Sequence, residues 1–225
     1  VGIMTSIGRQ LSIGKTDNTS DQRTPRKRLR LIPADVRESF VPVIPARAVQ
    51  RQNEWDLTRI APNRPRAEGS PIEVKGTVRN ESGTLLRGAL IEIWNANHHG
   101  RYRHVEDHSG LKLDENFFGI GRVITDEYGN YRFWTISPGA YLARPDIGRW
   151  RPKHIHLSIS CGSSRIITQM YFPNEPNNAS DPMALLMGDS FDRNLGKPYE
   201  TKIPEVDQGY DFDIVVGGKN ATFFE

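Results

Sequence analysis

The sequence of 225 residues has very little cysteine and no long apolar run. Its single thiol, Cys161, cannot form a disulfide within the chain, and it excludes metal clusters that several thiolates hold. We expect Cys161 to be a buried, inert thiol, because the sequence shows no positioned base for a catalytic cysteine. No stretch approaches the roughly 20 apolar residues of a membrane-spanning helix, and no secretory signal is visible. These absences predict a cytoplasmic protein with no membrane partner.

The sequence also lacks a strong net charge. Thirty Lys and Arg residues against 27 Asp and Glu residues give +3, which is too small to indicate a nucleic-acid partner. Five basic residues nevertheless cluster near the N-terminus: Arg23, Arg26, Lys27, Arg28 and Arg30. Without interleaved aromatic residues, this cluster predicts a solvated arm or a subunit contact rather than a nucleic-acid site.

Long amphipathic helices are missing as well, and the repeating pattern is that of short strands separated by turn residues. The expected strands are 72–79, 89–94, 122–125, 131–135, 154–160, 166–172 and 210–216, with a short helix at 182–187. The first two strands are expected to pair antiparallel, and tight turns join the third to the fourth and the fifth to the sixth. The pattern predicts an all-β protein, a β-sandwich with long functional loops and an extended N-terminal arm.

The domain organisation follows from a change in composition near residue 70. Residues 1–70 are rich in Arg, Asn, Pro and Ser, and they predict an extended arm with short helical or turn pieces at 33–39 and around Trp55. Such an arm must lie on the domain or contact a partner. Residues 71–225 are expected to form the β-sandwich catalytic domain, with its function in the long loops.

Two histidines, His154 and His156, stand one residue apart in the fifth expected strand. A strand alternates its side chains between two faces, so both imidazoles point the same way, roughly 6–7 Å apart along the strand. Such a pair can bind one metal ion, although the pattern by itself is more often a structural pair.

Two loop tyrosines, Tyr102 and Tyr141, could complete a metal site. A loop tyrosine usually caps the edge of a core. A phenolate is also a hard oxygen ligand that suits Fe³⁺, and a nearby cation lowers the phenol pKa below its free value of about 10. Two phenolates and two imidazoles would leave a ferric ion one positive charge and room for hydroxide. This set has no carboxylate, unlike the two-His-one-carboxylate ferrous site.

Four sequence blocks occur in order: WNAN at 94–97 followed by GRYRH at 100–104, PGAY at 138–141, WRPKHIH at 150–156 and ITQMYF at 167–172. These blocks resemble the intradiol ring-cleaving dioxygenases, and the similarity runs from about Pro71 to the C-terminus. It is strongest to the iron-bearing β subunits of that family, which act on protocatechuate.

The resemblance implies one mononuclear, non-haem Fe³⁺ ion, with Tyr102, Tyr141, His154 and His156 as its protein ligands and hydroxide in the fifth position. It also implies that a chelating catechol displaces Tyr141. The implied reaction opens the ring of a para-substituted catechol with O₂, between the two hydroxyl-bearing carbons, and converts protocatechuate to 3-carboxy-cis,cis-muconate. The metal would act as a Lewis acid that activates and orients the substrate.

The resemblance assigns two further residues to the site. Arg151 matches an arginine that stabilises negative charge developing on the ring, and its alternative role is a surface ion pair. Gln169 matches a residue that hydrogen-bonds near the metal, and an ordinary core or cross-strand role is equally open. Trp150 is expected to pack. The other loop histidines are expected to be solvated or to lie behind the ligands: His98, His99, His104 and His108.

Two departures from the family pattern affect the expected substrate. Ala143 stands where the familiar β subunits have a tryptophan, and residues 1–70 contain no tyrosine to match the one that lines the familiar pocket. A reshaped pocket makes 4-sulfocatechol an alternative to protocatechuate. The resemblance also implies a homologous α subunit as partner, in a higher-order hetero-oligomer, with the arm lying across it.

Three alternatives compete with this interpretation. A catechol 1,2-dioxygenase would carry a helical N-terminal segment, which the pattern of residues 1–70 does not favour. A non-catalytic structural subunit would lack the four ligand positions. A zinc or ferrous hydrolase built on the two histidines would need a carboxylate ligand, for which Glu106, Asp107 and Asp146 are the candidates.

Overall fold

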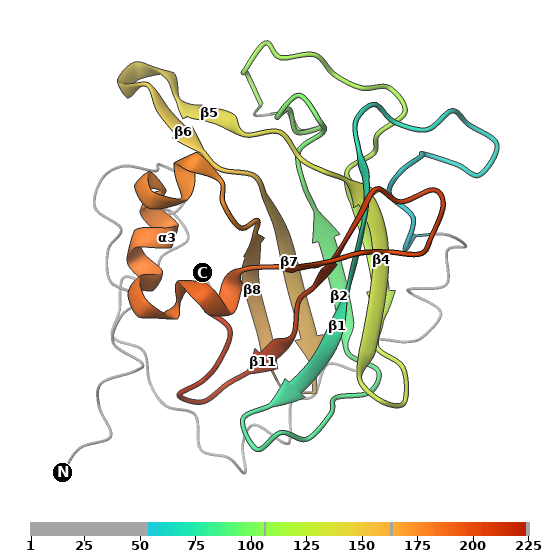
Figure 1. Cartoon of the computed structure of the whole chain (residues 1–225), viewed down its shortest axis with the longest axis vertical. Helices are drawn as coiled ribbons and strands as arrows, with labels where there is room; N and C mark the ends of the chain where they lie inside the picture. The colour runs from blue at the N-terminus through green and yellow to red at the C-terminus, as the bar shows by residue number, and fades with distance from the viewer. Residues whose placement is uncertain (1–53, 106, 163, 224–225) are drawn as a thin grey trace.

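Two β-sheets enclose one apolar core in the computed structural model of the chain, which describes residues 54–105, 107–162 and 164–223 (Figure 1). The first sheet is organised around β1, which pairs antiparallel with β4 along one edge and parallel with β10 and β11 along the other. Strand β9 extends this sheet from β10. The bounds are β1 (Pro71–Asn80), β4 (Asn130–Ile136), β9 (Lys197–Tyr199), β10 (Gln208–Asp211) and β11 (Ile214–Val216).

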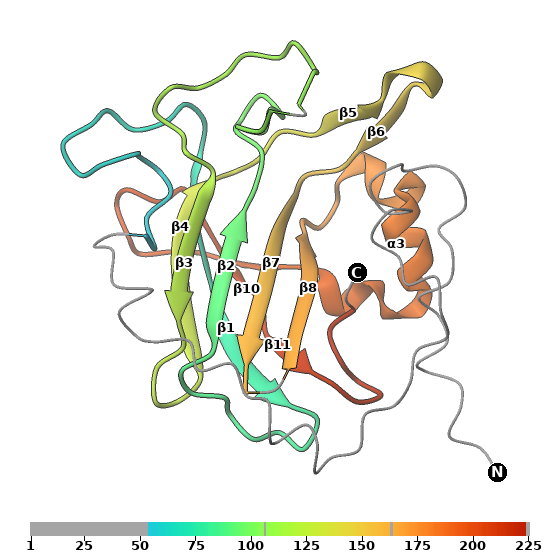
Figure 2. The same ribbon diagram turned by 180° about the vertical axis from the view of Figure 1, so that it is seen from behind.

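The second sheet has four antiparallel strands in the order β3-β2-β7-β8, which Figure 2 shows from the front. Its strands are β2 (Leu90–Trp94), β3 (Ile120–Ile124), β7 (His154–Cys161) and β8 (Ser164–Tyr171). All four run antiparallel to their neighbours, so the ends of β2, β7 and β8 that carry Trp94, His154 and Tyr171 lie at one end of the sheet.

The remaining elements lie at one side of the molecule. A two-stranded ribbon of β5 and β6 leads into β7, and α3 lies beside β8 below this ribbon (Figures 1 and 2). The bounds are β5 (Tyr141–Arg144), β6 (Arg149–Arg151) and α3 (Pro182–Met187), with 3₁₀ turns at η2 (Pro145–Ile147), η3 (Pro176–Ser180) and η4 (Gly188–Asn194). Strands β5, β6 and β9 fall in segments that were expected to be loops.

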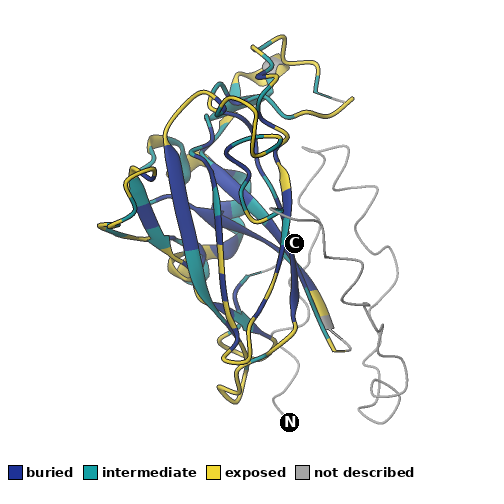
Figure 3. Cartoon of the chain, turned by 90° about the vertical axis from the view of Figure 1, so that its right-hand side faces the viewer, coloured by how far each residue is buried: buried dark blue, intermediate teal, exposed yellow. Residues whose placement is uncertain are grey.

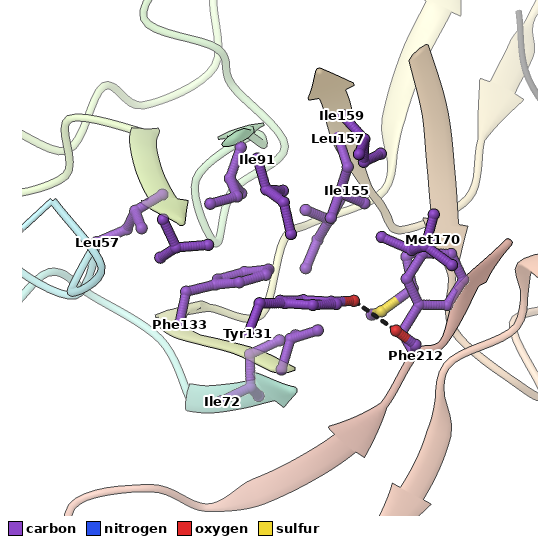
Figure 4. Packing of buried hydrophobic residues seen from close by; sticks show 14 of the residues in the cluster. Leu57, Ile72, Ile91, Tyr131, Phe133, Ile155, Leu157, Ile159, Met170 and Phe212 are labelled. Atoms are coloured by element: carbon purple, nitrogen blue, oxygen red, sulfur yellow. Dashed lines mark hydrogen bonds between the residues drawn. The ribbon is translucent and has the colours of Figure 1, made fainter. Parts of the chain in front are cut away.

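Alternation along the strands sends one set of side chains into the core. On β7, Ile155, Leu157 and Ile159 have no exposed surface, and they belong to the apolar cluster of Figure 4. Burial of each such side chain contributes about 1.5–3 kcal/mol. Figure 3 shows the same division, with buried residues along the strands and exposed residues in the loops. Because the faces alternate, His154 and His156 lie on the outer face of the second sheet.

The predicted all-β architecture is confirmed, as are the β7–β8 hairpin and the helix at 182–187. The last expected strand is instead divided into β10 and β11. Between them the chain comes very close to β1, where a Cβ at Gly76 would lie 2.1 Å from the carbonyl oxygen of Phe212. There the side chain of Asp213 accepts the backbone N–H of Thr77 at 2.9 Å, and this bond interrupts the strand ladder.

The expected pairing of the first two strands is wrong, whereas the turn expected between the third and fourth strands is present, with Asp126 donating its backbone N–H to Asn130. Strands β1 and β2 lie in different sheets, and so do β3 and β4, because β3 pairs with β2 and β4 pairs with β1. The turn after β1 does reverse the chain, since Asn80 donates to Thr84 and Leu86 donates to Val78 through their backbones. The chain then crosses to the second sheet before β2 begins. A turn signal in the sequence predicts the reversal but not how far the returning segment stays paired.

Residues 54–70 are the described part of the expected arm, and those around Leu57 lie against β4. Leu57 donates its backbone N–H to Trp134, and Trp134 donates to Trp55. The rings of Trp55 and Trp134 meet edge to face, with centroids 5.0 Å apart. The short helical or turn piece expected at 33–39 and the basic cluster at 23–30 lie outside the described residues. None of the helices in residues 54–223 that the structure describes is long and apolar enough to cross a membrane.

Candidate metal centre

The candidate centre begins with two imidazoles on the outer face of β7. The Nε2 atoms of His154 and His156 are 3.1 Å apart. His154 Nδ1 lies 2.7 Å from the carbonyl oxygen of Pro152, which can only accept, so Nδ1 carries the proton and Nε2 presents its lone pair. Burial, reinforced by the nearby charge of Arg151, holds the pKa of His154 well below its ordinary value. The ring is therefore neutral, as a metal ligand must be.

Two phenol groups reach the same point from separate loops. The Tyr102 hydroxyl lies 3.4 Å from His154 Nε2. The ring of Tyr141, at the start of β5, is perpendicular to that of Tyr102 with centroids 5.5 Å apart, and it lies 5.8 Å from the ring of His154. The ring of Tyr102 lies 6.1 Å from that of His156. Four side chains from three segments thus face one another.

A close contact between two loops brings the tyrosines together. Gly100 has a φ of +84°, and a Cβ there would lie 2.4 Å from the carbonyl oxygen of Ala140, next to Tyr141. Gly139 donates its backbone N–H to Asn97 at 2.9 Å, and a Cβ on Gly139 would lie 2.5 Å from Gly100 N. Both glycines are needed because only a residue without a side chain permits this approach.

The donor set fits a ferric ion better than the carboxylate-based alternatives. Among the described residues, no group of three or more His, Cys, Asp or Glu side chains is placed to hold a metal ion. Asp107 accepts the backbone N–H of Tyr102 at 2.7 Å, and Asp146 pairs with Arg144 at 2.6 Å. Glu106 lies outside the described residues. The donors that remain beside the two imidazoles are phenol oxygens, which are hard ligands suited to Fe³⁺.

Arg151 lies beside this cluster and is not a surface ion pair. Its side chain is 14% exposed, and Nε donates to Asp181 Oδ2 at 3.0 Å, where the carboxylate has no exposed surface. Although burial opposes the charge, Tyr141, Tyr171 and Asp181 together hold the pKa of Arg151 above its ordinary value. The guanidinium therefore remains a buried cation next to the tyrosines, where it can stabilise negative charge.

Gln169 lies opposite His156 in the β7–β8 ladder and is 1% exposed. Its Oε1 accepts from Arg151 Nη2 at 2.7 Å and from the Tyr171 hydroxyl at 3.0 Å. Arg151 Nη2 also donates to the Tyr171 hydroxyl at 2.9 Å. Gln169 thus has a cross-strand place and also belongs to a polar network that reaches Arg151.

Three neighbours of the site were not predicted from the sequence. Tyr171 lies opposite His154 in the ladder, with ring centroids 5.8 Å apart, and Trp94 stacks on His156. Both could have been found, because strand alternation puts their side chains on the face of the histidines once β2, β7 and β8 are paired. Asp181 offered no comparable signal, since its partner is 30 residues away in the sequence.

The remaining candidates lie outside the cluster. Trp150 was expected to pack, but it lies on the ribbon with 47% of its surface exposed. Cys161 is half-buried at the end of β7 rather than fully buried, and burial raises the pKa of its thiol. The other histidines are loop residues, of which His99 pairs with Glu68 at 2.7 Å. A separate groove lined by residues of β1, β3 and β4 contains none of the four donors.

Known proteins are similar to this chain in sequence and in fold. A family profile described as Dioxygenase matches residues 45–218. The chain is 37% identical over 211 residues to the protocatechuate 3,4-dioxygenase beta chain of Burkholderia cepacia, with 92% of this chain and 89% of that protein covered. The dioxygenase domain of a dioxygenase carbohydrate-binding protein fusion from Streptomyces sp. SirexAA-E superposes with a TM-score of 0.52 at 27% identity, over 73% of this chain and 87% of that chain. Catechol 1,2-dioxygenase from Acinetobacter sp. ADP1 superposes with a TM-score of 0.55 at 26% identity, over 71% of this chain and 55% of that chain. The chain therefore belongs to the family of intradiol ring-cleaving dioxygenases.

Proposed function

We propose that this chain binds one ferric ion through Tyr102, Tyr141, His154 and His156 and cleaves the ring of a catechol with O₂. The observation that carries the proposal is the meeting of two phenols and two imidazoles beside a buried arginine. The names of the relatives, a protocatechuate 3,4-dioxygenase beta chain and a catechol 1,2-dioxygenase, support a catecholic substrate. The bound ferric ion would supply Lewis-acid activation of the chelated catechol toward O₂.

The side chains of the site would each have a distinct role in the reaction. A catechol that binds through both oxygens must lose two protons, and the phenolate oxygen of Tyr141 would be placed to accept one of them. His154 stays fixed, because the carbonyl oxygen of Pro152 holds its Nδ1 proton. The guanidinium of Arg151 would stabilise the negative charge that develops on the ring. Gln169 would hold that guanidinium through its Oε1.

The substrate we propose is a para-substituted catechol with an anionic group, with protocatechuate first and 4-sulfocatechol as the alternative. Ala143 lies at an irregularity of the β5–β6 ribbon, between Leu142 and Arg144, and its small side chain leaves room near Tyr141. Arg144 and Arg149 face each other across the ribbon, and together with Asp146, which pairs with Arg144, they carry one net positive charge that favours an anionic substituent. The ratio of kcat/KM for the two substrates on purified enzyme decides between them, and a strong protocatechuate preference removes the alternative.

The central proposal is tested by colour and by product. Ferric tyrosinate absorbs visible light, so the iron-loaded protein should be burgundy, and anaerobic protocatechuate should shift the band. Tyr102→Phe and Tyr141→Phe should each alter the band and abolish or strongly reduce ring cleavage. Tyr128→Phe is the matched control, because Tyr128 is 62% exposed in the turn before β4. An iron-replete protein without a visible band, or wild-type ring cleavage by both variants, contradicts the proposal.

We further propose a homologous α subunit as partner, with residues 1–70 as a partner-contacting arm and residues 71–225 as the catalytic domain. The support is the name of the relative, a beta chain, and the scarcity of apolar periodicity in residues 1–53. Co-expression with a homologous α chain should raise solubility and activity, as measured by size-exclusion chromatography and turnover. A fully active homo-oligomer of this chain alone would remove the need for an α subunit.

A further inference from the structure

The guanidinium of Arg151 is held along one edge by acceptors from two different parts of the fold. Nε donates at 3.0 Å to Oδ2 of Asp181, the residue just before α3. Nη2 donates to Gln169 Oε1 at 2.7 Å and to the Tyr171 hydroxyl at 2.9 Å, both on β8. A guanidinium is planar with its five N–H groups in a fixed fork, so fixing Nε and Nη2 also fixes the direction of Nη1.

The hydrogen bonds of Arg151 leave its third nitrogen available. Every hydrogen bond that Arg151 donates within the described residues starts from Nε or Nη2. Its two N–H groups at Nη1 have no acceptor in this part of the chain. Arg151 lies directly opposite Tyr141 in the β5–β6 ladder, and the ring of Tyr141 lies 5.5 Å from that of Tyr102. The guanidinium therefore lies next to the candidate centre with donors that no described residue uses.

Asp181 is itself fixed at both carboxylate oxygens. Oδ2 accepts from Arg151, and Oδ1 accepts the backbone N–H of Met183 at 2.8 Å as the N-cap of α3. The backbone N–H of Asp181 donates to Asn177 at 3.0 Å, and the residue has no exposed surface. An N-cap alone does not need a charge, because Asn and Ser cap as well as Asp does. The buried charge is explained by its pairing with Arg151, since a buried cation needs a partner.

We propose that Asp181 is a positioning residue for the ring-cleavage reaction: it holds the Arg151 guanidinium so that Nη1 presents its N–H groups to the bound substrate. The inference rests on the proposed function and deepens it, because it joins the segment 175–187 to the site. A second ion pair, Lys153 with Glu175 at 3.3 Å, ties the same segment to the chain just before β7 without touching Arg151. Removing this neighbouring pair therefore tests the attachment of the segment alone, because it leaves the hydrogen bonds that orient Arg151 in place.

The decisive variant is Asp181→Asn, which is nearly isosteric. Its amide oxygen can still cap α3 at Met183, whereas its NH₂ group cannot accept from Arg151 Nε. We expect kcat/KM to fall by roughly 10²-fold, as small misplacements of a positioned group do, while iron content and the visible band stay at the wild-type level. Glu175→Gln is the matched control, and it should keep kcat/KM within about twofold of wild type, as expected for a partly exposed pair.

A double-mutant cycle distinguishes positioning from a structural role. If Asp181 acts through Arg151, then Asp181→Asn in an Arg151→Gln background should change kcat/KM by less than about twofold. The inference is overturned by wild-type kcat/KM in Asp181→Asn, by the same loss in both backgrounds, or by loss of the visible band. If the Asn variant does not fold, Asp181→Ser takes its place, because the serine hydroxyl also caps a helix. If neither variant folds, the inference is overturned and the role of Asp181 is structural only. A wild-type protein without the band or without ring cleavage contradicts the proposed function instead.

Discussion

The indole of Trp94 lies flat against the imidazole of His156, with ring centroids 4.9 Å apart and only 2° between the ring planes. The two residues are directly opposite each other in the β2–β7 ladder. On the other side of β7, Gln169 lies opposite His156 in the β7–β8 ladder. His156 is thus confined on the sheet by neighbours on both flanking strands, and its ring has little freedom to rotate away from His154.

The stack predicts a role for Trp94 in orienting a ligand. Trp94→Ala should leave the His156 ring free to rotate and should lower the affinity for iron by roughly 10- to 100-fold, which is the usual effect of losing a group that orients a metal-bound histidine. Trp94→Phe keeps an aromatic face and should keep most of the affinity. Iron content after dialysis against a chelator measures the effect. Equal iron retention in the Ala variant and the wild type would show that the stack does not orient His156.

The contact between the two tyrosine loops predicts an unusually sensitive glycine. Gly100→Ala places a Cβ 2.4 Å from a backbone oxygen at a φ of +84°, and this should cost about 1–3 kcal/mol and lower iron content. Gly110→Ala is the matched control in the same loop, because Gly110 has a φ of +69° but nothing within 4 Å of the added Cβ. Urea denaturation and iron content measure both effects. If the two variants behave alike, the loop contact does not organise the centre.

Alternate side chains of β7 face either the core or the candidate centre. Substitutions on the core-facing side should therefore lower the stability of the fold. Leu157→Ala removes a side chain with no exposed surface from the shared core, and it should cost about 2–5 kcal/mol of unfolding free energy. Leu185→Ala, at a leucine that is 65% exposed on α3, should change the stability by less than about 0.5 kcal/mol. Urea denaturation compares the two. A small loss for Leu157→Ala would mean that the two sheets do not share one tightly packed core.

Much of the site could be predicted because its signals are local. Period-two alternation on β7 predicts which face His154 and His156 share, and the order of the four blocks predicts that Tyr102 and Tyr141 belong with them. The resemblance also pointed to Arg151 and Gln169, which the structure brings together through a 2.7 Å hydrogen bond. Their function as ligands and partners of a metal remains a prediction.

The parts that could not be predicted depend on contacts between distant segments. The turns after β1 and β3 are visible in the sequence, but the crossing from one sheet to the other depends on which side of the shared core each strand covers. Asp181 directly precedes the expected helix at 182–187, and only the fold brings its second oxygen to Arg151. The ribbon of β5 and β6 is short and rich in Arg, so its composition resembled that of a loop.

The buried hydroxyl of Tyr131 gives a prediction about alkaline pH. It donates to the carbonyl oxygen of Phe212 within the core, where β10 gives way to β11 (Figure 4). Burial, with the nearby charges of Asp213 and Asp211, holds the pKa of Tyr131 well above its ordinary value. A group with a raised pKa in the folded state contributes stability that is present below its unfolded pKa of about 10 and is lost as the pH rises further.

Tyr131→Phe isolates this effect. At neutral pH it should cost about 1–2 kcal/mol, because the carbonyl oxygen of Phe212 loses its donor inside the core. Above about pH 10 the wild type should lose stability more steeply than the variant, since only the wild type must keep Tyr131 protonated. Tyr128→Phe, at an exposed position, should follow the wild type at every pH. Thermal unfolding midpoints between pH 7 and about pH 11 measure both slopes, and parallel curves for wild type and Tyr131→Phe would show that this hydroxyl is not the group that titrates.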